Sequence, residues 1–316
     1  MSTIVLASLL FFKLRRPSNA EANEIMRVLL FGCGYLGQRL ATRLTNEGHQ
    51  VFAVTRNPSR ADDWKKLGWE TVVANVVDTE SLQALPDVDV CVYAVGYDRS
   101  QPQSKETIYV DGVRNTLHAL DGRCKLFVYV SSSSVYGQDD GSVVDANSEC
   151  QPLTESGQIC QRAEQIVNQA PLRTTIVRLS GIYGPNRLLT RIDQLKAGKP
   201  LGGLAEAWLN LIHVDDAAHV LATLATKPGT EALHRTYLLS DLSPVQRQDF
   251  YKRLAELTDA PLPTFDTSLP TRSGLGGLGK QCSSREVLAD TGIELMFPSC
   301  ESGLIDAVHR TPQSQQ

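Results

Sequence analysis

The sequence predicts a doubly wound α/β fold, a parallel sheet with helices on both faces, followed by a smaller C-terminal lobe. Short β-branched runs alternate with helix-like stretches from Met26 to about Leu179, a pattern typical of such a sheet. We expect strands over residues 28–31, 51–54, 71–74, 90–94, 126–131 and 174–179. Beyond Gly181 the alternation fades and glycine-rich loops appear, which indicates a lobe lying over the carboxyl ends of the strands.

The chain therefore divides into a sheet domain (26–180), a smaller C-terminal lobe (181–310) and a tail (311–316) behind an unusual N-terminus. Residues 1–25 contain an apolar run, 4–12, with three basic residues close behind it. A bilayer span needs roughly 20 apolar residues, and a secretory signal carries its positive charge before the apolar run. We expect residues 1–25 to be a disordered extension or the product of an upstream start codon. A weak membrane anchor or targeting element is the alternative.

The composition is that of an ordinary globular protein, with 42% hydrophobic and 21% charged residues. The formal net charge of −4 argues against nucleic acid as a main partner, because phosphate binding favours a basic face. The seven cysteines are scattered and form no C-x-x-C pair, which is typical of free thiols in a reducing compartment. We expect a cytoplasmic protein without firm membrane association.

A glycine-rich loop at residues 32–37 reads Gly-Cys-Gly-Tyr-Leu-Gly. It follows a predicted strand directly and opens a predicted helix with a regular apolar stripe. Gly32 permits the tight turn, Gly34 allows the backbone to approach a pyrophosphate, and Gly37 lets the helix pack on the strand. In this strand–turn–helix context the loop predicts a Rossmann-type dinucleotide site. The expected cofactor contacts are Gly32, Gly34, Tyr35, Leu36, Gly37, Thr55, Arg56, Asn75, Val76, Ala94 and Gly96.

The end of the second strand favours NADP over NAD as the cofactor. An NAD site usually has an acidic residue there to bind the ribose 2′-hydroxyl. This chain has Thr55-Arg56-Asn57 and no acid before Asp62. Arg56 could hold a 2′-phosphate through paired charged hydrogen bonds. If Arg56 is only a solvated loop residue, NAD stays possible.

Three further blocks resemble a known family. They lie at residues 131–137 (SSSSVYG), 178–185 (RLSGIYGP) and 212–218 (IHVDDAA). They are similar to the S-S-x-x-V-Y-G, R-x-x-x-x-Y-G-P and I-H-V-x-D-x-A blocks of the extended short-chain dehydrogenase/reductases, the NAD-dependent epimerase/dehydratase superfamily. The resemblance covers about residues 26–308. It implies a Rossmann domain, a C-terminal substrate lobe, a pyridine nucleotide and often a nucleotide-sugar substrate.

The catalytic Tyr-x-x-x-Lys pair of that superfamily is missing. Counted back from Glu164, the tyrosine position holds Ser156 and the lysine position holds Cys160. A serine hydroxyl is a much weaker acid than a phenol, and a thiol cannot supply an ammonium charge. The Cys160 thiol could ionise, but a cysteine on the inner face of a helix is more often a small buried hydrophobe. The resemblance thus implies an atypical member.

The remaining catalytic candidates are Ser132 and Ser134, which the resemblance places near the nicotinamide. Their hydroxyls could hydrogen-bond a substrate carbonyl, or they could instead cap the end of the strand. A metal is not expected. His213, Asp215, Asp216 and His219 are close in sequence, but the resemblance makes the two aspartates the first turn of a helix.

The sequence is thus interpreted as an atypical NADP-dependent oxidoreductase or epimerase acting on a small polar or sugar-like substrate that it does not identify. The alternative is a non-catalytic NADP-binding sensor or scaffold, which the loss of the Tyr-x-x-x-Lys pair would permit. The helices near residues 105–120 and 156–170 could build a homodimer.

Overall fold

The computed structural model describes residues 24–226, 235–269, 271 and 276–312. The N-terminal extension, apart from its last two residues, and residues 313–316 of the tail lie outside the described residues. Neither interpretation of residues 1–25 is tested here.

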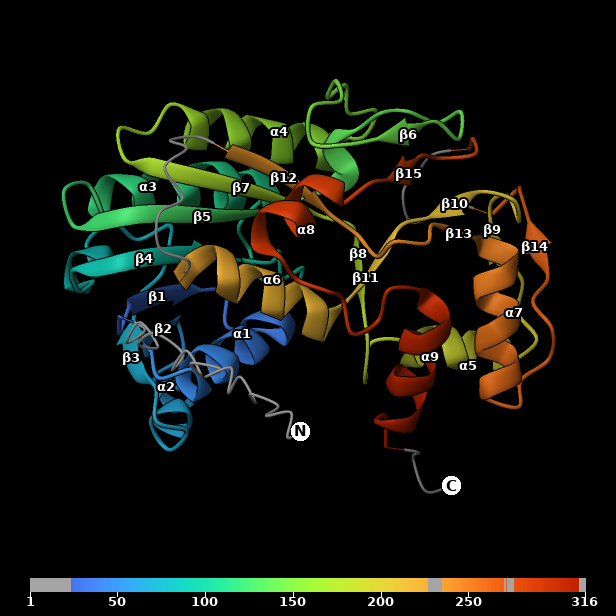
Figure 1. The fold of residues 1–316 in the computed structure, drawn as a ribbon, viewed down its shortest axis with the longest axis horizontal. Coiled ribbons are helices and arrows are strands. Elements are labelled where there is room, and N and C mark those ends of the chain that lie inside the picture. Colours follow the sequence, from blue (N-terminus) through green and yellow to red (C-terminus); the bar gives the residue numbers. More distant parts are fainter. Residues whose placement is uncertain (1–23, 227–234, 270, 272–275, 313–316) are drawn as a thin grey trace, which may run out of the picture.

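A seven-stranded sheet, parallel throughout, forms the centre of the larger domain (Figure 1). Its strand order is β12-β7-β5-β4-β1-β2-β3. The strands are β1 (Arg27–Phe31), β2 (Gln50–Thr55), β3 (Glu70–Val73), β4 (Val88–Tyr93), β5 (Cys124–Ser132), β7 (Arg173–Leu179) and β12 (Arg235–Leu239). The order reverses at β1 and β4, so the carboxyl ends of the central strands open a crevice there. The predicted doubly wound α/β fold is confirmed.

The strands read as continuous apolar runs because both faces of the sheet are covered. In β4, Val90 and Val92 pack against one helix layer, whereas Cys91 and Tyr93 pack against the other. The first layer holds α1 (Tyr35–Asn46), α2 (Pro58–Lys65), α6 (Val214–Thr226) and α8 (Arg285–Thr291). The second holds α3 (Gly112–Ala119) and α4 (Glu155–Asn168).

The sheet domain uses residues from both sides of the expected boundary at residue 180. Strand β12 pairs with β7 in parallel, and α6 packs along α1. Both elements fall within residues 181–310, the segment assigned to the lobe from the sequence. The chain thus crosses between the lobe and the sheet domain repeatedly, returning to the sheet domain first with α6 and β12 and later with α8.

The lobe has its own small core at the right of Figure 1. Its helices are α5 (Leu189–Lys196), α7 (Arg247–Leu257) and α9 (Cys300–His309). Tyr183, Phe250, Tyr251 and Leu304 are buried between them. Short strand pairs complete the lobe: β8 (Gly181–Tyr183) with β11 (Leu211–His213), β9 (Leu201–Gly202) with β14 (Phe265–Asp266), and β10 (Trp208–Leu209) with β13 (Val245–Gln246). Strand β6 (Val143–Val144) pairs with β15 (Gln281–Cys282).

The sheet domain has three short helical turns, η1 (Ser81–Ala84), η2 (Thr107–Asp111) and η3 (Ser133–Val135). Two of them, η2 and η3, contribute residues to the crevice. Of these, η2 is a π-helical turn that runs directly into α3. Such turns occur frequently at functional sites because they re-aim side chains within a helix.

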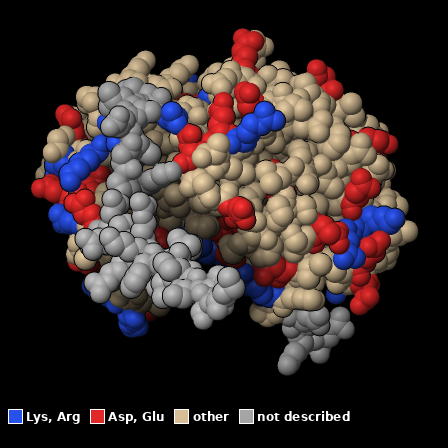
Figure 2. All heavy atoms as spheres, viewed as in Figure 1, with Lys and Arg blue, Asp and Glu red and all other residues tan. Residues whose placement is uncertain are grey.

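The surface carries both signs of charge, and Figure 2 shows acidic and basic side chains interspersed over the face in view. None of the helices in the described segments is long and apolar enough to span a bilayer. All seven cysteines are free thiols, and only Cys150 is more than slightly exposed.

Candidate active site

One large pocket, about 1380 Å³ in volume, lies between the carboxyl ends of the strands and the lobe. Ten of the eleven expected cofactor residues line it: Gly32, Gly34, Tyr35, Leu36, Thr55, Arg56, Asn75, Val76, Ala94 and Gly96. The eleventh, Gly37, lies behind the loop. A Cβ on Gly37 would come within 2.4 Å of the Gly32 carbonyl oxygen, so its role is helix-to-loop packing.

The glycine loop has the geometry of an anion cradle. Gly32 has a φ of +84°, and a Cβ there would lie 2.1 Å from the Ala94 carbonyl oxygen. Around Gly34, in contrast, no atom lies within 4 Å of a Cβ position, so the loop leaves room on its pocket side. No side chain caps the N-terminus of α1, so its first-turn N–H groups are available to a phosphate. These residues fit the pyrophosphate of a dinucleotide.

Tyr35 ties the glycine loop to the lobe. Its hydroxyl donates a hydrogen bond to the Pro185 carbonyl oxygen at 2.9 Å. The guanidinium groups of Arg39 and Arg187 lie 4.3 and 5.2 Å from the centre of its ring, within cation–π range. A change in the position of the lobe would therefore alter the contacts of Tyr35 in the cofactor loop.

At the far end of the cofactor region, two arginines project from the segment after β2. Arg56 lies 3.8 Å from Asp98 in an exposed ion pair, which is weak enough to exchange for a phosphate. Arg60, in α2, also lines the pocket. Sequence reasoning missed Arg60, although its position one helical turn after Arg56 would have been a usable signal.

The serine run, residues 131–134, begins within β5 and divides its side chains between the pocket and the protein interior. Ser132 and Ser133 line the pocket. The Ser132 hydroxyl also accepts a hydrogen bond from the Ser134 amide at 3.2 Å. The Ser134 hydroxyl points instead toward the Cys160 sulfur, at 3.9 Å. Of the two expected catalytic serines, Ser132 is therefore the one that lines the cavity.

Cys160 and Ser156, four residues apart on α4, differ in their access to the pocket. Cys160 lines it, whereas Ser156 does not. The hydroxyl of Ser156 accepts a hydrogen bond from the ammonium of Lys105, a residue 51 positions earlier in the chain. Sequence reasoning missed Lys105 and the pocket-lining Tyr109. Their four-residue spacing was the only signal, and many surface helices carry such a pair.

Glu164, from which the positions of the missing Tyr-x-x-x-Lys pair were counted, has a structural role. Glu164 is buried and forms an ion pair with Arg178, Nη2 to Oε2 at 2.7 Å. It also accepts a hydrogen bond from the Ser131 hydroxyl at 2.6 Å, and Arg178 donates to the Tyr136 hydroxyl at 2.8 Å. This network joins β5, β7 and α4 beneath the serine run.

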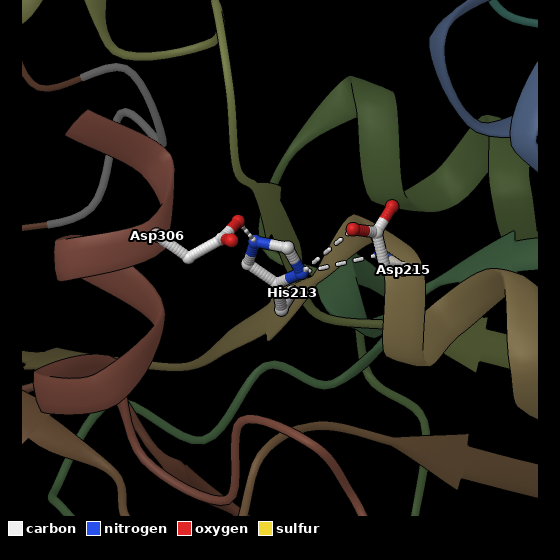
Figure 3. Close-up of side chains that lie close together, drawn as sticks. All are labelled: His213, Asp215 and Asp306. Carbon is white, nitrogen blue, oxygen red and sulfur yellow. Dashed lines mark hydrogen bonds and ion pairs between the residues drawn. The ribbon is translucent and has the colours of Figure 1, made fainter. Parts of the chain in front are cut away.

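The histidine cluster lies where the lobe meets the sheet domain (Figure 3). The buried ring of His213 sits between Asp306, 3.2 Å from Nε2, and Asp215, whose amide donates to Nδ1 at 3.3 Å. Burial lowers the pKa of His213, while the nearby carboxylates oppose that effect. Arg310 lies 2.7 Å from Asp215 and 3.1 Å from Asp306.

This charge arrangement bears on the expected absence of a metal. The carboxylates of Asp215 and Asp306 could hold a cation together with His213. Arg310 and Arg39, however, already form ion pairs with Asp215. Asp216 faces elsewhere and accepts hydrogen bonds from the amides of Met296 and Phe297. The absence of a metal stays a prediction.

The lobe end of the pocket is rich in positive charge. Arg187, Arg191, Arg247 and Lys280 line it. Within the described residues, none of the four is ion-paired with a carboxylate. Burial lowers the pKa of Arg247, and the neighbouring Arg191 lowers it further. An anion between these two side chains would relieve both effects.

A family model described as the NAD dependent epimerase/dehydratase family matches residues 28–239. The chain belongs to this family. The resemblance seen in the sequence blocks is thereby confirmed, and with it the NAD-binding character of the fold.

Relatives match over most of their length. Protein YeeZ of Escherichia coli strain K12 is 28% identical over 279 residues, covering 86% of this chain and 96% of its own. A solved structure assigned to the NAD-dependent epimerase/dehydratase class from Methylobacillus flagellatus is 31% identical, with a TM-score of 0.73, 90% of this chain covered and 98% of its own. UDP-glucuronic acid 4-epimerase of Bacillus cereus, solved with UDP-glucuronic acid and NAD, shares the fold at 18% identity, with a TM-score of 0.73 and coverage of 90% and 98%.

Proposed function

We propose that this family member is an NADP(H)-dependent oxidoreductase that reduces a carbonyl group on an anionic, sugar-like substrate. One observation carries the proposal: a single pocket runs from the glycine loop, past Ser132, to the arginines of the lobe. A dinucleotide seated on the loop and an anionic substrate held by the lobe would meet at the serine run.

The preference for NADP rests on charge at the end of β2. Arg56 and Arg60 border the pocket there, and no carboxylate occupies the position that would bind a ribose 2′-hydroxyl. Two guanidinium groups suit a 2′-phosphate, which carries up to two negative charges. The pocket-lining carboxylate Asp98 is itself ion-paired with Arg56.

The substrate class rests on the cationic end of the pocket. Arg191 and Arg247 are close enough for the first to depress the pKa of the second. Aromatic rings of Tyr251 and Phe265 lie beside Arg247, at 5.9 and 5.4 Å. A guanidinium flanked by rings is suited to a phosphate or carboxylate attached to a flat or sugar-like group. The Bacillus cereus neighbour was solved with a substrate of this kind, UDP-glucuronic acid.

The test is a panel of carbonyl compounds, in matched anionic and neutral forms and including nucleotide sugars, with loss of the NADPH absorbance as the readout. Turnover of anionic members is expected. Arg191→Gln and Arg247→Gln should raise KM for them about tenfold each, and leave neutral members unaffected. Arg253→Gln is the matched control. Arg253 lies on α7, as Arg247 does, but it pairs with Glu301 and does not line the pocket.

A protein that binds NADPH but turns over no member of the panel would overturn the oxidoreductase proposal. That outcome would favour the non-catalytic sensor or scaffold. Pull-downs with and without NADPH would then show whether the partners depend on the cofactor.

A further inference from the structure

An ammonium group from another segment of the chain contacts α4, which has no lysine of its own. Lys105 begins the helical segment that continues through η2 into α3. Its ammonium donates a hydrogen bond to the Ser156 hydroxyl and lies 5.0 Å from the centre of the Tyr109 ring. The neighbouring carboxylate, Glu106, pairs with Arg162 at 3.0 Å instead. The charge of Lys105 is thus directed toward α4 and not toward an acid.

The Cys160 thiol is the group on α4 whose pKa the Lys105 ammonium affects. Cys160 follows Ser156 by one helical turn, so both lie on the same face of α4. Its side chain is only 4% exposed, and it lines the pocket beside Tyr109 and Ser132. Burial raises the pKa of Cys160, and the ammonium of Lys105 is the strongest influence in the other direction, followed by the Ser134 hydroxyl. Glu164, also on α4, raises it.

We propose that Lys105 supplies, from a different helix, the ammonium group that α4 lacks, and that it acts through Cys160 as the proton donor for carbonyl reduction. Lys105 is in this sense a positioning residue, and Cys160 is the group that meets the substrate. The assignment rests on the proposed reductase function.

The proton and electron balance is simple. The substrate carbonyl carbon accepts a hydride from the reduced nicotinamide while its oxygen takes the proton of the Cys160 thiol. The carbonyl is reduced to an alcohol, the NADPH is oxidised, and the sulfur is left as a thiolate beside the Lys105 ammonium. Water then returns a proton to the sulfur. A raised thiol pKa suits this direction, because the group is protonated before the step.

The neighbouring hydroxyl groups are less suited to this role. Ser156 does not line the pocket, and a serine hydroxyl is a weak acid. Tyr109 also lines the pocket, and its hydroxyl accepts a hydrogen bond from the Tyr97 amide at 3.1 Å. Lys105 contacts the face of the Tyr109 ring, with its ammonium 5.0 Å from the ring centre. Burial raises the pKa of Tyr109, the hydrogen bond from the Tyr97 amide opposes that rise, and the nearby Cys160 adds to it. Tyr129, on β5, is a buried phenol close to the same thiol.

The first test needs neither substrate nor cofactor. The rate of alkylation of Cys160 is measured against pH with a small thiol reagent, and each cysteine is followed by peptide mass spectrometry. Burial raises the pKa of Cys33, Cys282 and Cys300 to about 12, so these thiols react little in the useful range. Lys105→Met should reduce Cys160 alkylation about tenfold at a given pH, moving the profile upward. Lys105→Arg should restore it, and Lys125→Met, at a surface ion pair with Asp89, should change nothing.

An unchanged alkylation profile in Lys105→Met would overturn the proposal. The second test uses whichever carbonyl substrate the panel identifies. Cys160→Ser should lower kcat about a hundredfold or more, with NADPH affinity kept. Full turnover in Cys160→Ser together with loss in Tyr109→Phe would overturn the role of Cys160 and assign it to the phenol. A shifted alkylation profile without turnover of any substrate would support the electrostatic role of Lys105 while overturning the reductase.

Discussion

Arg178 and Glu164 form a buried ion pair, with Nη2 and Oε2 2.7 Å apart. The pair links β7 to α4, and through the hydroxyls of Ser131 and Tyr136 it also holds the two ends of the serine run. Ser132 and Ser133, which line the pocket, lie between those two anchors. The geometry of the candidate active site thus depends on a charge pair that never touches a ligand.

Glu164→Gln should destabilise the protein by about 3–5 kcal/mol, because it leaves the Arg178 charge buried without its counter-charge. Chemical denaturation followed by circular dichroism measures the loss. Asp111→Asn, which breaks an exposed pair with Arg114, is the control and should have little effect. Equal effects of the two substitutions would show that the buried pair does not hold the fold.

Gly34→Ala should separate cofactor binding from folding. No atom lies within 4 Å of the new methyl group, so the substitution introduces no packing clash. The methyl group would occupy the room left for the pyrophosphate, and NADPH affinity should fall at least about tenfold, or about 1.4 kcal/mol. Unchanged affinity by calorimetry would place the dinucleotide elsewhere.

The matched variant, Gly32→Ala, should instead lose stability. Its Cβ would lie 2.1 Å from the Ala94 carbonyl oxygen at a φ of +84°, which strains the loop itself. A Gly32→Ala protein as stable as the wild type would contradict the close packing of this loop on the end of β4.

Asp241→Asn should flatten the dependence of stability on pH. Burial raises the pKa of Asp241 from 3.8 to about 7, with Asp216 adding to the rise and the Ser243 amide opposing it. Since the folded-state pKa is raised, stability is fully present below about pH 4 and is lost as the pH rises through about 7. The loss is at most about 4 kcal/mol. Thermal unfolding across this window should show a smaller decline in the variant, and an identical decline would mean that Asp241 does not cause it.

The sequence predicted the sheet better than the lobe for a physical reason. A strand such as β4 is buried on both faces, so Val90-Cys91-Val92-Tyr93 leaves a continuous apolar signal. The strand pairs of the lobe have only two or three residues each, too few to show any period. Strand β12 was missed because it follows a long lobe segment, and sequence order does not reveal that the chain returns to β7.

The candidate site likewise combines a feature that the local sequence predicts with contacts that it does not. The glycine loop is encoded within six adjacent residues, so its turn, open face and helix start could be read locally. Lys105 reaches Ser156 across 51 positions, and nothing in the sequence around either residue shows that they meet. Arg191 and Arg247 likewise come from different helices, α5 and α7. Contacts of this kind depend on how the elements pack, which one sequence does not display.

The preference for NADP is the part of the proposed function that a single binding measurement can test. Calorimetric titration of NADPH and NADH into the wild type and Arg56→Glu tests it most directly. The account predicts tighter binding of NADPH by the wild type, and at least about a tenfold loss of NADPH affinity in Arg56→Glu with NADH binding little changed. Equal binding of the two cofactors by the wild type, or an equal loss of both in the variant, would contradict a 2′-phosphate at Arg56.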